Sequence, residues 1–272
     1  MVWHRTEKLA QSPRMRNSRN AGVPVTLLLA YHRVLPTAPK DNIHILANAQ
    51  FERQIALLAD SGLEIAPPDE FDRPSSGGRH RVGITFDDGF SSDLRCAELL
   101  HKHKMRALFF ISSAPVGTPG YLNEGGVRSL IDMGMKIGSH SHEHIQMTPD
   151  RAAYQAGTSK DALTRMTGSP IEDFAFVGGV CTDQTIAAVH ASGYKRVYTT
   201  EWGVNSAANV QSGVYRRNCL VQGMTDKQFL DLITARNRNT RQALYLLKGF
   251  AARHLPRKAY NRLQRLYVSV RG

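Results

Sequence analysis

Two adjacent carboxylates follow a predicted strand, in the sequence TFDDG at residues 85–89. Adjacent residues after a strand point in different directions, so one carboxylate of Asp87 and Asp88 can bind a metal ion while the other faces a substrate. In a parallel α/β fold, active sites gather where such strands end. Because Asp is also common in turns and at helix N-caps, this motif alone leaves a purely structural role open.

Three histidines within five residues follow a second predicted strand, in the sequence HSHEH at 140–144. Imidazoles four residues apart can converge on one cation from one side of a turn or helix. Together with Asp88, His140 and His144 supply three protein ligands, and this number leaves a position open for water, as in catalytic metal sites. His142 alternates with them and is expected to point away. A solvent-exposed polar loop is the alternative interpretation.

The elements that must position these residues alternate between short strands and helices. Apolar runs predict strands at 25–30, 63–66, 81–86, 107–111, 136–140, 174–177, 196–199 and 214–215. Amphipathic spacing predicts helices at 51–59, 94–103, 127–133, 149–166, 182–192 and 225–234. This alternation, without a Pro-rich linker, is typical of β-α units around a parallel sheet and favours one barrel-like domain. The absence of a glycine-rich phosphate loop disfavours nucleotide binding.

The two motifs stand about fifty residues apart, and each follows a strand. With them the sequence resembles the polysaccharide deacetylases of the NodB-homology type (carbohydrate esterase family 4). Their first motif is T-F-D-D-G and their second is H-[S/T]-x-x-H, and both are intact here. The resemblance covers roughly residues 25–234, and LAYHRV at 29–34 resembles the branch that modifies bacterial exopolysaccharides. It implies an α/β fold, a distorted (β/α) barrel, and hydrolytic removal of N-acetyl groups from GlcNAc-containing oligo- or polysaccharides such as chitooligosaccharides.

The resemblance also implies a role for each motif residue. Asp87 is the general base, and Asp88, His140 and His144 bind a divalent metal, zinc or else cobalt. The metal would polarise the amide carbonyl and lower the pKa of its water toward ~7, so that a carboxylate can take the proton. The late Leu-x-His motif that supplies the general acid in many members is absent. His32, in the early Tyr-His motif, is therefore the candidate acid, and a buried histidine that only hydrogen-bonds a neighbour is the alternative.

The substrate groove departs from the family pattern. Residues 174–179 read FAFVGG where this branch usually reads F-x-Y-P-x-G, so Val177 replaces a proline and Gly178 replaces a larger residue. The residues assigned to substrate binding are Phe176, Gly178, Trp202 and Arg216. Trp202 is a candidate platform for a sugar ring, although a core aromatic is the favoured interpretation. Arg216 or Arg217 is expected to orient the base, with plain surface charge as the alternative for at least one of them.

The basic charge is concentrated at the two ends of the chain. The net charge is +12, from 35 Lys and Arg against 23 Asp and Glu. Residues 1–22 hold five basic residues and one acidic residue, residues 236–272 hold ten and none, and residues 23–235 hold 20 against 22. We therefore predict a basic irregular N-terminal segment, a nearly neutral catalytic domain at 23–235, and a basic amphipathic helical tail. The tail is expected to cap the barrel or to dock on an anionic membrane, with the cap slightly favoured.

Composition excludes several other classes of protein. The three scattered cysteines, Cys96, Cys181 and Cys219, argue against a disulfide scaffold and a structural zinc module. No apolar run reaches the ~18–20 residues that span a bilayer, and residues 23–30 make a poor signal peptide. We expect a cytoplasmic enzyme, peripheral to the inner membrane, whose partner is an N-acetylated glycan. Nucleic acid is not expected, because the core lacks a recognition motif and aromatic residues interleaved with basic ones.

Two further functions stay open at this point. One is a deformylase or deacylase of a lipid-linked amino sugar at the membrane surface, where a basic tail would be useful. The other is a non-catalytic glycan-binding protein on the same fold, which the altered residues 177–178 and the missing Leu-x-His motif would allow. The presence of Asp87, Asp88, His140 and His144 argues against this loss of activity.

Overall fold

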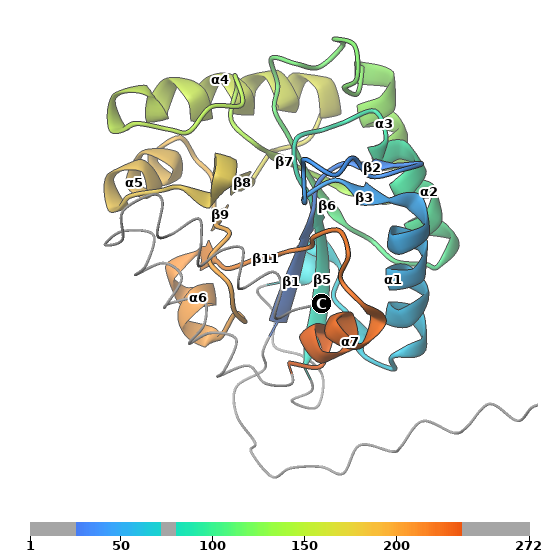
Figure 1. Cartoon of the computed structure of the whole chain (residues 1–272). Coiled ribbons are helices and arrows are strands. Elements are labelled where there is room, and N and C mark those ends of the chain that lie inside the picture. The colour runs from blue at the N-terminus through green and yellow to red at the C-terminus, as the bar shows by residue number, and fades with distance from the viewer. Residues whose placement is uncertain (1–25, 72–79, 236–272) are drawn as a thin grey trace, which may run out of the picture.

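The computed structural model describes residues 26–71 and 80–235 (Figure 1). In them a curled parallel sheet is surrounded by helices. The strands are β1 (Thr26–Tyr31), β2 (Val34–Leu35), β3 (Leu46–Ala47), β4 (Glu64–Ile65), β5 (Arg81–Phe86), β6 (Leu108–Ile111), β7 (Lys136–Ser139), β8 (Asp173–Ala175), β9 (Arg196–Tyr198), β10 (Val214–Tyr215) and β11 (Asn218–Cys219). The α-helices are α1 (Asn48–Asp60), α2 (Asp93–Lys102), α3 (Glu124–Asp132), α4 (Pro149–Thr167), α5 (Asp183–Ala191), α6 (Ala207–Ser212) and α7 (Asp226–Ile233).

The order of the strands makes the sheet a barrel that is open on one side. The sheet runs β10-β9-β8-β7-β6-β5-β1-β11, β4 pairs with the first half of β5, and all these pairs are parallel. The predicted distorted (β/α) barrel is therefore confirmed. The predicted strand at 174–177 is shorter than expected, because Gly178 adopts a positive φ of 64° inside a 3-10 turn at Val177–Gly179.

Side chains on the two faces of the sheet form two separate cores. Alternate residues of a strand face opposite sides, so Leu108 and Phe110 of β6 face the barrel interior and Phe109 and Ile111 face the helices. The interior cluster is Leu28, Ala66, Phe71, Leu108, Phe110, Ala175, Tyr198 and Tyr215. Helix residues belong only to the outer cluster, which includes Phe51, Ile55 and Leu130. The barrel interior is thus filled by aromatic rings and is no channel.

Two glycines make room for these rings. A Cβ atom on Gly83 of β5 would lie 2.5 Å from side-chain atoms of both Leu28 and Phe71. A Cβ atom on Gly138 of β7 would lie 2.7 Å from the ring of Phe110. Both distances are shorter than a van der Waals contact, so the interior packing depends on these positions having no side chain.

Side-chain amides bridge the open side of the sheet, between β1 and the segment that joins β10 to β11. Asn205 forms an antiparallel bridge with Thr26, and its Nδ2 donates to the carbonyl of Arg216 at 2.9 Å. Its Oδ1 accepts from the backbone N–H of Arg216 at 2.7 Å. Asn218 Nδ2 donates to the carbonyls of Leu28 (3.2 Å) and Gly203 (2.7 Å). These two buried asparagines fix the backbone on both sides of residue 217.

Two expectations from the sequence concern the two basic ends of the chain and membrane-spanning segments. The basic segments at 1–22 and 236–272 lie outside the described residues. Within 26–71 and 80–235, no helix is both long enough and apolar enough to cross a membrane.

The tight interior predicts opposite effects for two glycine substitutions. Gly83→Ala should lower the free energy of unfolding by about 1–3 kcal/mol, because the added methyl group collides with Leu28 and Phe71. Gly157→Ala in α4 should be neutral or stabilising by up to about 1 kcal/mol, because nothing lies within 4 Å of its added Cβ and alanine favours the helix. Urea unfolding of both variants measures the difference. Equal stabilities would contradict the close packing of the interior.

Candidate metal centre and active site

Three ligand-type side chains converge at the ends of β5 and β7. Asp88 follows β5, and His140 and His144 follow β7. One ligand atom from each lies within 4.8 Å of the other two. Asp88 Oδ1 is 3.4 Å from His140 Nε2 and 2.9 Å from His144 Nε2. Asp88 and His140 are buried and His144 is half-buried, so the cluster can be reached from solvent on the His144 side.

The backbone at these residues is strained. Asp88, Ser141 and His144 have positive φ values of 84°, 67° and 56°. Such conformations cost about 1–3 kcal/mol for residues other than glycine and persist only where the surroundings hold them. Pairing between the β6 and β7 ends supplies part of this support, because Ser113 N–H donates to the carbonyl of Ser141 at 3.3 Å.

A side chain of α4 holds the turn at residues 140–144, which we call the histidine turn. Gln155 of α4 is fully buried, and its Oε1 accepts from the backbone N–H groups of His142 (3.1 Å) and Glu143 (2.9 Å). Its Nε2 donates to the carboxylate of Glu143, which also pairs with Arg151 at 2.6 Å. His142 turns away from the metal ligands and bonds Ser113 Oγ through Nδ1 at 2.8 Å. Gln155 therefore clamps the backbone between the two ligand histidines.

The tautomer of His140 is set by the neighbouring strand. Its Nδ1 lies 2.8 Å from the carbonyl oxygen of Ala175, at the end of β8. A carbonyl can only accept, so Nδ1 carries the hydrogen and Nε2 keeps its lone pair for a cation. This arrangement is the usual support for a metal-binding histidine.

Asp87 forms a two-pronged ion pair with Arg217 inside the barrel mouth. Arg217 Nη2 donates to Oδ2 at 2.8 Å, and Nη1 donates to Oδ1. Both residues are almost completely buried. The guanidinium also donates from Nε to the carbonyl of Thr199 at 3.2 Å and lies over the Phe110 ring, 4.9 Å from its centroid. Asp87 is thus held in one orientation beside the ligand cluster.

The charges of the site favour ionised carboxylates. Burial opposes ionisation of Asp87, but the Arg217 guanidinium and the imidazoles of His140 and His32 outweigh it and lower its pKa. Burial likewise opposes ionisation of Asp88, and the neighbouring imidazoles of His140 and His144 bring its pKa far below the usual range. His140 itself is buried, which disfavours its charged form, yet the two carboxylates leave its pKa raised.

His32 lies close to Asp87. Its Nε2 is 3.8 Å from Asp87 Oδ2, and its ring centroid is 5.2 Å from that of His44. Its Nδ1 is buried and has no hydrogen-bond partner among the described residues. Burial lowers the pKa of His32, although Asp87 and Asp88 act against this effect. Because its pKa is lowered, His32 is mainly neutral near neutral pH. It lies beside the carboxylate of Asp87.

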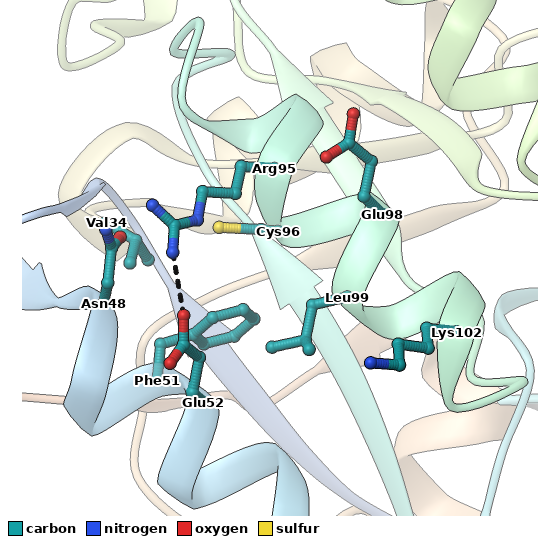
Figure 2. A pocket seen from close by; sticks show the side chains of 9 residues that line it. All are labelled: Val34, Asn48, Phe51, Glu52, Arg95, Cys96, Glu98, Leu99 and Lys102. Carbon is teal, nitrogen blue, oxygen red and sulfur yellow. Dashed lines mark hydrogen bonds and ion pairs between the residues drawn. The ribbon is translucent and has the colours of Figure 1, made fainter.

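A cavity of about 260 Å³ lies between α1 and α2, away from the ligand cluster. An ion pair joins Arg95 to Glu52 at its edge, with 2.8 Å between Nη2 and Oε1 (Figure 2). Its lining residues are Val34, Asn48, Phe51, Glu52, Arg95, Cys96, Glu98, Leu99 and Lys102. None of the candidate catalytic or metal-binding residues lines it, so it belongs to the helical layer and not to the site.

A family model matches the part of the chain that holds both motifs. Residues 75–197 match the model for polysaccharide deacetylases, and this range contains Asp87, Asp88 and the histidine turn. The chain is also 25% identical over 222 residues to YxkH of Bacillus subtilis (strain 168), which is named as an inferred polysaccharide deacetylase. This alignment covers 79% of this chain and 72% of YxkH.

Two further proteins resemble this chain. It is 35% identical over 77 residues to the peptidoglycan-N-acetylglucosamine deacetylase PgdA of Listeria monocytogenes, which is 28% of this chain and 16% of that protein. Its fold is similar to that of the Streptococcus pyogenes deacetylase PplD, solved in complex with acetate, with a TM-score of 0.69 and 22% identity over 78% of this chain and 99% of the other.

The donor set of this cluster fits a divalent metal ion. Two imidazole nitrogens and one carboxylate oxygen are the ligands that catalytic zinc and similar first-row cations take, with a further position left for water. The Nδ1 hydrogen bond of His140 leaves its Nε2 free to face Asp88 Oδ1, 3.4 Å away. Asp88, His140 and His144 would hold the ion, and no other group of three such residues lies close enough together in the described parts of the chain.

The structure separates the residues that we predicted for the substrate groove. Phe176 has no exposed surface, and its ring packs edge-on against Phe174 in the outer core, so its side chain does not line a groove. Trp202 is half-buried against the same core. Arg216 pairs with Glu201 at 3.2 Å, and Arg217 is the arginine that contacts Asp87. Gly178 is exposed in its turn.

The clamp by Gln155 predicts a loss of metal affinity when it is removed. Gln155→Ala should weaken zinc binding by about 10- to 100-fold, because groups that orient metal ligands typically contribute this much. Competition with a chromophoric chelator measures the affinity, and Asp161→Ala on the exposed face of α4 is the control. An unchanged affinity in a folded Gln155→Ala variant would show that the turn does not need the clamp.

The raised pKa of His140 predicts how zinc binding depends on pH. Zinc needs the neutral imidazole, so protons compete with it below the pKa of His140 in the metal-free protein. Affinity should fall by about tenfold per pH unit for each proton displaced, starting at a higher pH than for an ordinary histidine. Calorimetry between about pH 5.5 and 8 measures it. Asp87→Asn removes one cause of the shift, so the fall should then begin at a lower pH.

Proposed function

We propose that this chain is a metal-dependent N-deacetylase that acts on GlcNAc-containing oligo- or polysaccharides. The observation that carries the proposal is the buried Asp87–Arg217 pair beside the three-ligand cluster of Asp88, His140 and His144. The family match supports the removal of acyl groups from a polysaccharide. The name of the Listeria relative supports N-acetylglucosamine as the sugar, and a bound acetate in the Streptococcus structure is the expected second product.

The proposed reaction begins with attack of water on the amide carbon of the N-acetyl group. A divalent metal held by Asp88, His140 and His144 would polarise the amide carbonyl and acidify the water. Asp87 accepts the proton as the new C–O bond forms, and Arg217 keeps the carboxylate ionised and aimed during this step. The C–N bond then breaks, and the sugar nitrogen leaves as an amine that needs one proton.

His32 is suited to deliver that proton. Because burial lowers its pKa, His32 is mainly neutral in the resting protein and must first receive a proton. The nearest source is Asp87, whose Oδ2 is 3.8 Å from His32 Nε2. A small movement brings the two atoms within hydrogen-bond distance, so the proton taken from water can pass through His32 to the amine. The products are acetate and a free amino sugar.

Substitutions of the base and of its arginine partner test this scheme. Asp87→Asn should reduce acetate release from GlcNAc oligomers by about 10²–10⁴-fold while the zinc content stays the same, because only the proton acceptor is lost. Arg217→Met should cost about 3–5 kcal/mol of stability as well as activity, because it leaves Asp87 buried without a partner. Acetate is measured enzymatically on zinc-loaded protein. The proposal fails if no GlcNAc oligomer yields acetate with the wild-type protein.

A further inference from the structure

Three side chains form a stack beside the catalytic turn. The guanidinium carbon of Arg33 lies 4.9 Å above the centroid of the Phe90 ring. Phe90 in turn stacks on Tyr121, with 5.1 Å between the ring centroids and 26° between the planes. All three residues are half-buried, and they come from the segments that follow β1, β5 and β6. The stack therefore lies at the same end of the barrel as the ligand cluster.

The backbone ties this stack to the catalytic residues. Phe90 and Tyr121 form an antiparallel bridge, and Leu122 N–H donates to the carbonyl of Gly89 at 2.9 Å. Phe90 stands two residues after Asp88, and Arg33 directly follows His32. Because these neighbours belong to the proposed machinery, a group that contacts the stack lies next to the reacting centre.

The hydrogen-bond donors of Arg33 are unused within the described parts of the chain. Apart from the exposed Arg165, every other arginine there makes an ion pair: Arg53, Arg81, Arg95, Arg106, Arg128, Arg151, Arg196, Arg216 and Arg217. Among the described residues the side chain of Arg33 makes no ion pair or hydrogen bond, and its buried Nε has no acceptor. The carboxyl of Asp93 lies within electrostatic range of Arg33, but no hydrogen bond or ion pair joins the two side chains in the described residues.

An arginine in this position can donate hydrogen bonds to an acceptor on a bound molecule. A guanidinium carries five N–H donors in a fixed fork, and leaving a buried donor without an acceptor is costly. The Phe90 ring holds the guanidinium plane in place without using its N–H groups. Aromatic surface combined with a few fixed donors is the composition of sites that bind small polar molecules.

We propose that Arg33, Phe90 and Tyr121 form a subsite for a sugar residue next to the one that is deacetylated. The apolar face of the pyranose packs against the half-buried aromatic rings, and its hydroxyl or acetamido oxygens accept from Arg33. This inference rests on the proposed function, because it places a glycan at the site. It makes the stack a determinant of chain-length preference, since a monosaccharide cannot fill the reacting position and the subsite together.

Binding in the absence of turnover tests the subsite. The full chain carrying Asp87→Asn, loaded with zinc, is titrated calorimetrically with the fully N-acetylated GlcNAc pentamer and with the GlcNAc monomer. Adding Arg33→Met should weaken pentamer binding by about 10- to 100-fold, because a charge-assisted donor is lost. Arg33→Lys keeps the charge without the fork and should recover only part of the affinity. The control is Arg165→Met, at the exposed end of α4.

The outcomes separate this inference from the proposed function. Unchanged zinc affinity in the Arg33 variants shows that the fold and the metal site are intact, so a selective loss of pentamer binding supports the subsite. Equal pentamer binding by the Asp87→Asn protein with and without Arg33→Met overturns the subsite and leaves the deacetylase proposal standing. If the pentamer neither binds to the Asp87→Asn protein nor yields acetate with the wild type, both fail.

Discussion

The buried pair of Asp87 and Arg217 is the interaction around which the domain is organised. Each charge alone would be strongly disfavoured by burial, and a paired, fully hydrogen-bonded arrangement removes most of that cost. Arg217 donates hydrogen bonds to the carboxylate of Asp87 and to the carbonyl of Thr199. Its guanidinium packs over the ring of Phe110, which belongs to the aromatic interior of the barrel. The same guanidinium therefore both packs against the barrel interior and keeps Asp87 ionised.

The same pair explains why the metal ligands stand where they do. Val82, Ile84 and Phe86 of β5 face the helices, so Gly83, Thr85 and Asp87 face the interior. The left-handed conformation of Asp88 then turns the next carboxylate toward β7. The histidine turn meets it there, because Gln155 and the end of β6 hold its strained backbone. One strand thus supplies both the proposed proton acceptor and a candidate metal ligand.

The sequence alone predicted those site residues that directly follow a predicted strand. Asp88, His140 and His144 were found because each follows a recognisable strand, and their convergence needs only the parallel arrangement of those strands. Arg217 was left as one of two choices, because β10 has two residues and is too short to set the phase of the alternation. Tyr215 faces the interior, so Arg217 does too and Arg216 faces outward. The same alternation places Phe176 with Phe174 on the helix side, which the family pattern did not reveal. Gln155 was missed because its partners are set by tertiary packing.

The open side of the barrel has a consequence for how such a site can vary. Strand pairing fixes the position of a chain only in whole registers, and a slip of one residue reverses every side chain. At the β10–β11 junction the closure is made by the side-chain amides of Asn205 and Asn218. Residues 216 and 217 lie between the ladder of β10 with β9 and that of β11 with β1, so side-chain hydrogen bonds hold them in place of a strand register. The position of the buried cation relative to its carboxylate therefore depends on two amide side chains, which single substitutions can change while the strand pairing stays as it is.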